Sequence, residues 1–347
     1  MEILESLLKN FNFLNITVTN IYFYLILILI NISIFKSLIT ISNKFNLYDI
    51  PNNRKLHLKP ISYLGGLFFF VSNFSFILYY RTYLFESHFL IYNLSNVFSL
   101  IIISSLIFVI GLIDDKVDLN PLKKTIILMV LISSAVLIDN QLLIKDLNFE
   151  IIDRSFNLKE FSFFFTILCI YIFINACNMY DGADLQVGLY FLILLFYLYF
   201  KSNYLNIFTP LLIPLFIFLI ANYKKICFLG NNGSHFLSYI LAIFILKFYN
   251  MNILNSVEEV VIIMLIPGLD LTRLFFLRVL NNKKFFESDM NHIHHLLFKN
   301  NSKNKVQFIL LGLNLSPIII GEISGSYLVG IIFGILIYIF FILRKTV

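Results

Sequence analysis

Long apolar runs recur along almost the whole of this 347-residue chain, and they constrain its fold more than any other feature. Runs of about 17–25 apolar residues have the length that a transmembrane helix needs. Charged residues make up only 13% of the chain, whereas a soluble domain carries about 25%. We therefore expect an all-α, polytopic membrane bundle that forms a single domain over residues 1–347, rather than the two soluble domains that length alone suggests.

The apolar runs predict about eleven transmembrane helices. They fall at residues 18–41, 64–80, 95–113, 123–140, 161–177, 186–200, 207–222, 235–250, 256–276, 306–322 and 325–343. The pair 186–200 and 207–222 is the least regular, because Pro210 and Pro214 interrupt it, although membrane helices tolerate proline when neighbouring helices satisfy the freed backbone groups. Between the fourth and fifth runs, residues 141–160 alternate apolar and polar side chains in places, which predicts a short hairpin.

The distribution of lysine and arginine predicts the orientation of the chain in the membrane. Of the 26 basic residues, 17 follow the odd-numbered runs or lie in the C-terminal tail, and 7 lie on the opposite side. Cytoplasmic loops are enriched in Lys and Arg, so we expect the N-terminus outside and the C-terminus in the cytoplasm. The net charge of +6 fits this pattern, and no basic cluster is interleaved with base-stacking aromatic residues, so nucleic-acid binding is not expected.

Polar, chemically reactive side chains gather in five loops, all on the predicted cytoplasmic side. These loops span about residues 42–63, 114–124, 178–188, 223–235 and 277–305. The three cysteines, Cys169, Cys177 and Cys227, have neither a disulfide framework nor a zinc-ligand spacing, and we interpret them as small buried hydrophobic residues.

The stretch "GLIDDKVDLNPLKK" (111–124) places Asp114 and Asp115 side by side where an apolar run ends. Adjacent carboxylates raise each other's pKa unless a cation lies between them. Mg²⁺ prefers carboxylate oxygens and keeps open positions for phosphate oxygens, which makes this pair a candidate metal or phosphate site. The alternative is an ordinary solvated loop start, since acidic pairs are common at helix ends.

The stretch "NACNMYDGADLQVG" (175–188) offers Asn178, Asp181 and Asp184 at a spacing of three, which puts them near one face if the helix continues. Gly182 permits a tight turn or a close backbone approach. Because Asn and Asp also favour turns by themselves, a capped turn without further function is the alternative.

Three further stretches complete the set. "FLGNNGSH" (228–235) is a turn of the kind that can present backbone N–H groups to phosphate, but taken alone it is interpreted as a plain connecting turn. "SDMNHIHHLLF" (288–298) contains three of the six histidines, suited to a metal or, as donors, to a diphosphate. Without cysteine partners a zinc site is not expected, which leaves these histidines for an anionic ligand. "DIPNNRKLHLKP" (49–60) carries basic residues that suit a phosphate site or, generically, anionic lipid. The candidates in the last two stretches are His292, His294, His295, Arg54, Lys55 and His57.

Carboxylates, cationic groups and glycine turns at one membrane face indicate a metal-assisted phosphate reaction on a membrane-embedded lipid substrate. A transporter of lipid-linked sugars is the alternative in another class. Transporters place their polar groups near the bilayer midplane on broken helices, which the clustering at one edge disfavours.

Five ordered motifs between about residues 49 and 298 resemble those of the polyprenyl-phosphate N-acetylhexosamine-1-phosphate transferases, the WecA/MraY superfamily or glycosyltransferase family 4. "PNNRKLH" is similar to the family's P-N-x-R-K-x-H, and "GLIDDKVDLNPLKK" to its G-x-x-D-D-x-x-x-L-x-P-x-x-K. "NACNMYDGADLQVG" matches N-x-x-N-x-x-D-G-x-D, and "FLGNNGS" resembles F-x-G-D-x-G-S. "PGLDLTRLFFLR" (267–278) and "DMNHIHHLL" match the family's last cytoplasmic loop, and the H-I-H-H form is closer to the WecA branch.

The resemblance implies an initiating enzyme of a cell-surface glycan in a bacterial inner membrane, with its active site facing the cytoplasm. Such an enzyme transfers N-acetylhexosamine 1-phosphate from a UDP-sugar to polyprenyl (undecaprenyl) phosphate and releases UMP, with Mg²⁺ or Mn²⁺ as cofactor. Carried over by position, the catalytic residues are Asp114 and Asp115, and the metal residues are Asn178, Asp181, Asp184 and Asn231. The residues that bind nucleotide sugar or phosphate are Arg54, Lys55, His57, Lys124, His292, His294 and His295.

The chain also departs from the family pattern. The family's metal-binding aspartate in F-x-G-D-x-G-S is Asn231 here, the glycine after the second aspartate of D-G-x-D-G is Leu185, and the Pro-Arg before the glycine pair is Ser62-Tyr63. Two other interpretations within the same enzyme family remain: a MraY-like phospho-MurNAc-pentapeptide transferase, and a weakly active or inactive relative. The expected partners are the two substrates and membrane lipid. The sequence leaves open whether the protein also forms a homodimer.

Overall fold

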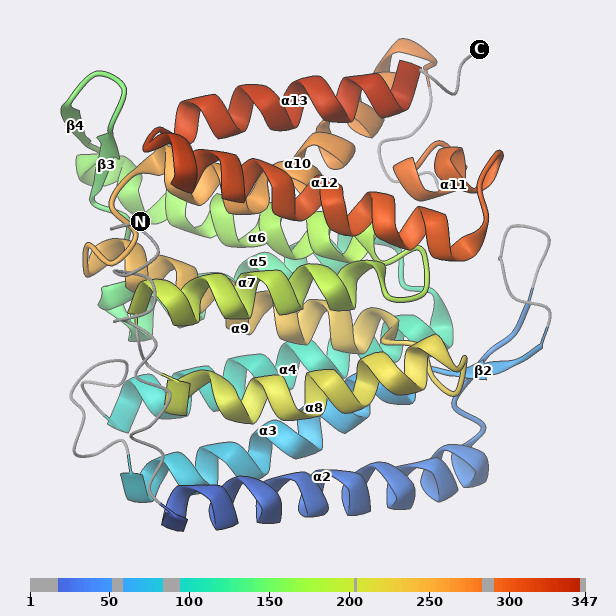
Figure 1. Cartoon of the computed structure of the whole chain (residues 1–347). Helices are drawn as coiled ribbons and strands as arrows, with labels where there is room; N and C mark the ends of the chain where they lie inside the picture. The colour runs from blue at the N-terminus through green and yellow to red at the C-terminus, as the bar shows by residue number, and fades with distance from the viewer. Residues whose placement is uncertain (1–17, 52–58, 84–93, 203–204, 283–289, 344–347) are drawn as a thin grey trace.

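The computed structural model describes residues 18–51, 59–83, 94–202, 205–282 and 290–343, most of them in helices that run back and forth between two ends of a bundle (Figure 1). The helices are α2 (Val18–Phe45), α3 (Leu64–Tyr83), α4 (Leu94–Val117), α5 (Pro121–Ile138), α6 (Ser162–Tyr180), α7 (Gln186–Ser202), α8 (Leu205–Tyr223), α9 (Gly230–Asn250), α10 (Val257–Leu280), α11 (Ile293–Phe298), α12 (Lys303–Ser324) and α13 (Tyr327–Leu343). Two short antiparallel pairs join them: β1 (Tyr48–Asp49) with β2 (Ile61–Ser62), and β3 (Asp146–Phe149) with β4 (Arg154–Asn157).

Helix α9 forms the centre of the bundle. Its residues from Asn232 to Tyr249 are all buried, and it packs against α3, α4, α6 and α7. A helix that is apolar on every side belongs in a core, which explains this position. The outer helices instead expose large apolar side chains such as Leu29 and Phe308, as expected of surfaces that face lipid.

Each predicted apolar run overlaps a long helix of the described residues, so the prediction of a helical bundle is confirmed. By length and composition, six of these helices are able to cross a membrane: 24–45, 95–117, 121–138, 159–180, 257–280 and 303–324. The irregular pair of runs forms α7 and α8, and α8 continues through both Pro210 and Pro214.

The predicted hairpin is also present, as β3 and β4. Its register pairs Asp146 with Asn157 and Phe149 with Arg154. The Glu258 carboxylate accepts hydrogen bonds from two backbone N–H groups in the turn, and the hydroxyl of Tyr249 accepts one from β3, so α9 and α10 hold the hairpin in place.

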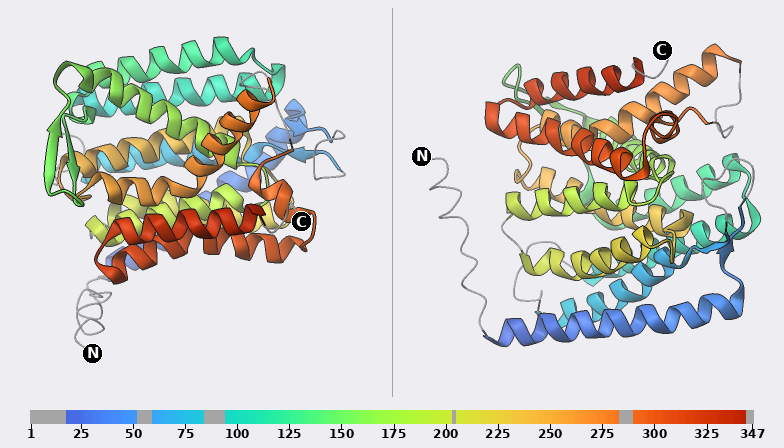
Figure 2. Two further views of the ribbon diagram at one scale, coloured as in Figure 1. Left: turned by 90° about the horizontal axis from the view of Figure 1, so that it is seen from above. Right: turned by 45° about the vertical axis from the view of Figure 1, so that its right-hand side comes forward.

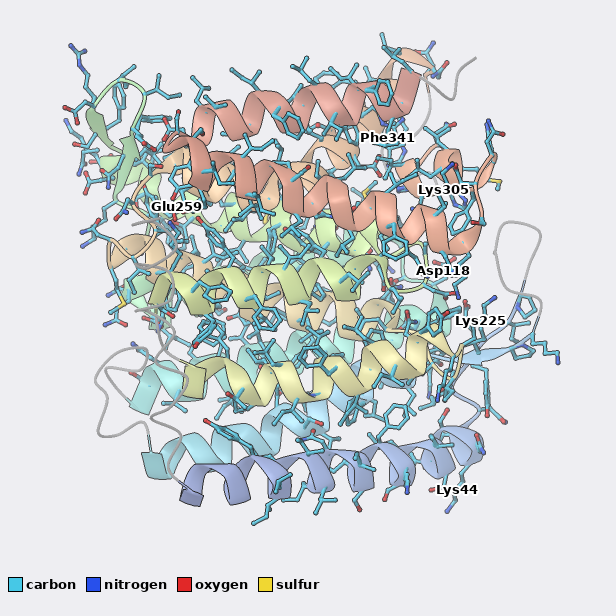
Figure 3. All side chains as sticks on the ribbon, in the orientation of Figure 1. Lys44, Asp118, Lys225, Glu259, Lys305 and Phe341 are labelled. Atoms are coloured by element: carbon cyan, nitrogen blue, oxygen red, sulfur yellow. The ribbon has the colours of Figure 1, made fainter. Side chains whose placement is uncertain are left out.

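The described residues that follow α2, α4, α6, α8 and α10 lie at one end of the bundle, which we call the site end. In Figure 3, Lys44, Asp118, Lys225 and Lys305 mark this end, and Glu259 marks the opposite one. Figure 2 shows from above that β3 and β4 lie at one end, whereas β1, β2 and α11 lie at the other. Chain topology alone therefore brings the five polar segments to the same end.

Candidate active site

Asp114 closes the last turn of α4 and connects it to two other helices. Its Oδ1 accepts a hydrogen bond from the backbone N–H of Leu119 (3.0 Å). Its Oδ2 accepts one from Nζ of Lys124 on α5 (2.9 Å) and one from Nδ2 of Asn231 on α9 (2.9 Å). The Asp114 side chain is buried. One lysine and two neutral N–H donors compensate the charge of its carboxylate.

Asp115 caps the N-terminus of α9. Its Oδ1 and Oδ2 accept hydrogen bonds from the backbone N–H groups of Asn231 (2.8 Å) and Asn232 (3.0 Å). A carboxylate is stabilised there by the free N–H groups and by the helix dipole. Two of the N–H groups in residues 228–235, those of Asn231 and Asn232, already donate to Asp115, so neither is free for a phosphate in this structure.

Asn231 forms an amide bridge between Asp114 and Asn178. While its Nδ2 donates to Asp114, its Oδ1 accepts a hydrogen bond from Nδ2 of Asn178 (2.7 Å). The Asn178 amide also donates to Oγ of Ser234 (2.9 Å). Polar contacts thus join α4, α6 and α9 at the site end, and two predicted metal ligands, Asn178 and Asn231, touch each other.

Asp181 directly follows α6 and carries the open carboxylate of the site. Burial raises the pKa of Asp181 to about 8, and the negative charges of Asp115 and Asp184 add to the rise. Among the described residues no hydrogen bond or ion pair reaches this carboxylate. A half-buried carboxylate without a partner is the place where a cation would relieve most charge.

Asp184 is directed toward α12. Its Oδ2 lies 2.7 Å from Nζ of Lys303, and that ammonium lies 5.4 Å from the centre of the Tyr223 ring. The backbone carbonyl of Asp184 accepts a hydrogen bond from Gln307. The structure therefore gives Asp184 a cationic partner that the sequence analysis did not assign.

Leu185 has a left-handed backbone conformation, with a φ of 66°. Its N–H donates to Oδ1 of Asn222 (2.6 Å), whose amide in turn donates to the carbonyl of Cys227 (2.9 Å). The family has a glycine at this position, and the observed φ gives a physical reason for that glycine. Asn222 links the α6–α7 loop to the segment that leads into α9.

The three predicted histidines form a compact group at the start of α11. The ring centres of His294 and His295 lie 4.3 Å apart, and those of His292 and His294 lie 5.4 Å apart. The His294 ring lies directly over Gly182, where a Cβ atom would approach its Cε1 to 1.9 Å. A side chain at residue 182 would displace the His294 ring. This contact therefore brings together the two motifs that carry Gly182 and His294.

His294 is buried, and burial together with the neighbouring His295 and His292 lowers its pKa well below the ordinary value. Its Nδ1 has no hydrogen-bond partner within the described part of the chain. A neutral imidazole with a free ring nitrogen is therefore available to a ligand at this point.

The predicted phosphate-binding residues Arg54, Lys55 and His57 lie outside the described residues. The segments on either side of them reach the site end: Phe228 donates its N–H to the carbonyl of Ser62 (2.7 Å). Gly66 packs so closely against Asn232 that a Cβ would come within 1.6 Å of its Oδ1. The strand β2 and the start of α3 thus lie against the N-terminus of α9.

Comparison with known proteins adds to this geometry. Residues 97–249 match the family described as Glycosyl transferase family 4. A probable undecaprenyl-phosphate N-acetylglucosaminyl 1-phosphate transferase of Bacillus subtilis is 25% identical over 303 residues, which cover 85% of this chain and 77% of the relative. Undecaprenyl-phosphate alpha-N-acetylglucosaminyl 1-phosphate transferases of Escherichia coli K12 and Salmonella typhi are 24% and 25% identical over 293 residues, covering 79% of this chain and 75% of each relative. These matches make the chain similar to glycosyl transferase family 4.

Six helices that are long and apolar enough to cross a membrane, together with the similarity to family 4, indicate an integral membrane protein. The matched segment contains Asp114, Asp115, Asn178, Asp181 and Asn231. The histidine group lies outside the matched segment. The contact between His294 and Gly182 connects this group to the matched segment.

The donor set of this site suits a hard divalent cation rather than zinc. No group of three or more His, Cys, Asp or Glu side chains gathers as a ligand set in the ranges described above. Mg²⁺ needs only one or two carboxylates when phosphate oxygens and water supply its other ligands. The Asp181 carboxylate fits that requirement, and Mn²⁺ accepts the same oxygen ligands.

Three residues that organise this end of the bundle were not predicted from the sequence. Lys303 pairs with Asp184, while Asp270 and Arg273 of α10 contact the histidine segment. An available signal was the Asp and Arg three residues apart within an apolar run, because ionisable residues inside a membrane segment are functional candidates.

Proposed function

We propose that this chain transfers N-acetylhexosamine 1-phosphate from a UDP-sugar to polyprenyl (undecaprenyl) phosphate and releases UMP. This reaction would initiate a cell-surface glycan. The curated relatives, which are named for N-acetylglucosaminyl 1-phosphate transfer to undecaprenyl phosphate, support the proposal.

One observation carries the proposal: carboxylate and amide groups from three helices meet at one end of an apolar bundle. Asp114 and Asp115 of α4 bond to the first turn of α9, and Asn178 of α6 bonds to Asn231 in that same turn. Asp181 stands one turn beyond Asn178 without a partner among the described residues. A lipid substrate in the membrane and a nucleotide in water are both able to reach such an end.

In the proposed reaction an oxygen of the lipid phosphate attacks the β-phosphorus of the UDP-sugar. A new P–O bond forms there, the bond from the β-phosphorus to the oxygen that bridges the two phosphates breaks, and UMP leaves with that oxygen. Direct attack and a two-step route through an aspartyl intermediate both give these products. Most of the rate enhancement then comes from positioning and from neutralising phosphate charge.

The residues of the chain divide between the two substrates in this proposal. Lys124, held 2.9 Å from Asp114, is the cation for the lipid phosphate, and Asp114 orients it. Asp181 with Asn178 and Asn231 would hold Mg²⁺, which supplies positive charge to the diphosphate. The histidine group, extended by Arg54, Lys55 and His57, binds the donor's phosphates.

The proposed membrane arrangement is the one that the basic residues predict. The site end faces the cytoplasm of a bacterial inner membrane, the N-terminus lies outside, and about eleven helices cross the bilayer. UDP-sugars are made in the cytoplasm, so this orientation gives the site access to its donor.

The test uses purified protein in detergent with UDP-N-acetylglucosamine, undecaprenyl phosphate and Mg²⁺. We expect release of UMP that requires Mg²⁺ and that falls by at least about 100-fold in Asp181→Asn, since the variant removes the open carboxylate. If none of a panel of UDP-N-acetylhexosamines yields UMP, the proposal is wrong. UDP-MurNAc-pentapeptide, supplied in parallel, separates the WecA-like reaction from the MraY-like one.

A second candidate, a weakly metal-binding relative, is favoured by Asn231. In this chain the amide of Asn231 joins Asp114 to Asn178, where the family's aspartate would add a negative charge for the cation. A transferase of this kind would need a higher Mg²⁺ concentration for half-maximal activity than its Asn231→Asp variant.

A further inference from the structure

Asp270 lies in α10 and is almost fully buried, with 2% of its surface exposed. Its Oδ1 accepts hydrogen bonds from Nη2 of Arg273 (2.7 Å) and from the hydroxyl of Tyr338 on α13 (2.8 Å). Nε of Arg273 also donates to the Tyr338 hydroxyl (2.8 Å). This Asp–Arg–Tyr group fixes the Asp270 carboxylate in one orientation.

The fixed carboxylate faces the histidine segment. It accepts a hydrogen bond from the backbone N–H of Ile293 (3.2 Å), and its Oδ2 lies 3.4 Å from Nδ1 of His292. Arg273 adds a hydrogen bond from Nη2 to the carbonyl of Asn291 (2.6 Å). The Asp270–Arg273 ion pair therefore holds the backbone of Asn291 and Ile293 by hydrogen bonds, and His292 lies between these two residues.

We propose that Asp270 is a positioning residue for the sugar-phosphate donor, acting through the histidine segment. The inference rests on the function proposed above and adds to it a residue that does not itself touch substrate. Asp270 faces Nδ1 of His292, so Nε2 on the other edge of that ring is the nitrogen left for the ligand. The same anchor holds His294 over Gly182, next to the open carboxylate of Asp181.

A carboxylate that orients a ligating imidazole typically changes affinity or activity by about 10–100-fold when it is replaced. The expected effect of Asp270→Asn is therefore a rise of about tenfold or more in the KM for the UDP-sugar. The KM for undecaprenyl phosphate stays unchanged, because that substrate is assigned to Lys124 and Asp114.

Glu259→Gln is the matched control. Glu259 lies in the same helix, is fully buried, and forms an ion pair with Lys201 (3.0 Å) and a hydrogen bond with Tyr197 (2.7 Å) at the opposite end of the bundle. Both variants remove a buried charge and should lower the thermal midpoint. Only Asp270→Asn should raise the donor KM.

A second measurement keeps the inference independent of the reaction. Diethyl pyrocarbonate modifies accessible histidines, and mass spectrometry of peptides reports the modification of His292 and His294. We expect several-fold faster modification in Asp270→Asn than in the wild type or in Glu259→Gln.

The outcomes separate the two proposals. An unchanged donor KM in Asp270→Asn, or an equal rise in Glu259→Gln, overturns the positioning role. If the wild type releases no UMP at all, the proposed function fails, and the histidine modification rates alone decide the positioning role, with equal rates in wild type and Asp270→Asn counting against it.

Discussion

Leu185 replaces the glycine of the family pattern and has a backbone conformation that is unusual for leucine. Its φ of 66° lies in the left-handed region, which costs an L-residue about 1–2 kcal/mol relative to the ordinary helical region. The conformation is held by the N–H of Leu185, which donates to Asn222. Leu185 also packs partly against the hydrophobic core, and this contact offsets part of the cost.

A pair of substitutions isolates the backbone contribution. Leu185→Ala and Leu185→Gly remove the same packing, but only glycine is free of the left-handed penalty. We expect Leu185→Gly to be more stable than Leu185→Ala by about 1 kcal/mol, the reverse of their order in a helix interior. Thermal unfolding in detergent measures the order, and a more stable Leu185→Ala would contradict the assigned backbone conformation.

Asn231 is a second residue at which the sequence of the site departs from the family pattern. An aspartate there would place a second carboxylate beside Oδ2 of Asp114, where the amide now donates at 2.9 Å. Two carboxylates at hydrogen-bond distance repel unless a proton or cation lies between them. The asparagine thus stabilises the site without a cation and lowers the negative charge available to one.

Asn231→Asp should therefore be less stable than the wild type without Mg²⁺, by about 1–3 kcal/mol, and should gain more stability when Mg²⁺ is added. Its activity should be preserved or raised at saturating Mg²⁺. Asn96→Asp is the control, because Asn96 donates to Asp139 (3.0 Å) at a buried place outside the site. An equal Mg²⁺ response in both variants, or complete loss of activity in Asn231→Asp, would refute this account of Asn231.

At the scale of elements, the contact between the α6–α7 loop and α11 joins the two halves of the site. Gly182 does not require a positive φ, so alanine fits its backbone and only the His294 ring is displaced. The ring is buried and cannot move away freely.

We expect Gly182→Ala to lose about 100-fold in kcat/KM, since a shift of about 1 Å in a site group has an effect of that size. Gly268→Ala is the matched control, because nothing lies within 4 Å of its added Cβ. Activity near the wild-type level in Gly182→Ala would mean that the position of His294 is not critical.

The same elements show what the sequence could and could not predict. Apolar runs predicted the long helices, because length and hydrophobicity decide where a membrane helix forms. The start of α9 at Gly230 was not predicted, because "GNNGS" has the local composition of a turn and its cap, Asp115, comes from a distant part of the chain. The partners of Asp184 and His292 were missed for the same reason: Lys303 and Asp270 meet them only in the folded bundle.

At the scale of the whole molecule, chain topology separates two chemically different ends. Lys305 lies at the site end, and Arg154 belongs to the hairpin that lies at the opposite end (Figures 2 and 3). Both side chains are exposed. If the bundle crosses the membrane as proposed, these two residues face different compartments.

Single cysteines at Lys305 and Arg154, introduced after Cys169, Cys177 and Cys227 are replaced by alanine, test this arrangement. A membrane-impermeant maleimide should label the Arg154→Cys variant from outside intact cells and the Lys305→Cys variant only after the cells are opened. Labelling of both from outside would place the site end and the hairpin on one side of the bilayer.

The central claim, that the polar groups gathered at one end of the bundle carry out phosphate transfer, is tested most directly by the fate of the donor's β-phosphate. UDP-N-acetylglucosamine labelled with ³²P at that phosphate is incubated with the protein, undecaprenyl phosphate and Mg²⁺, and the lipid is extracted. We predict that the label enters the lipid fraction with the wild type and falls to background with Asp181→Asn. Label that stays in water-soluble UDP while the sugar enters the lipid, or equal transfer by Asp181→Asn, would contradict the account.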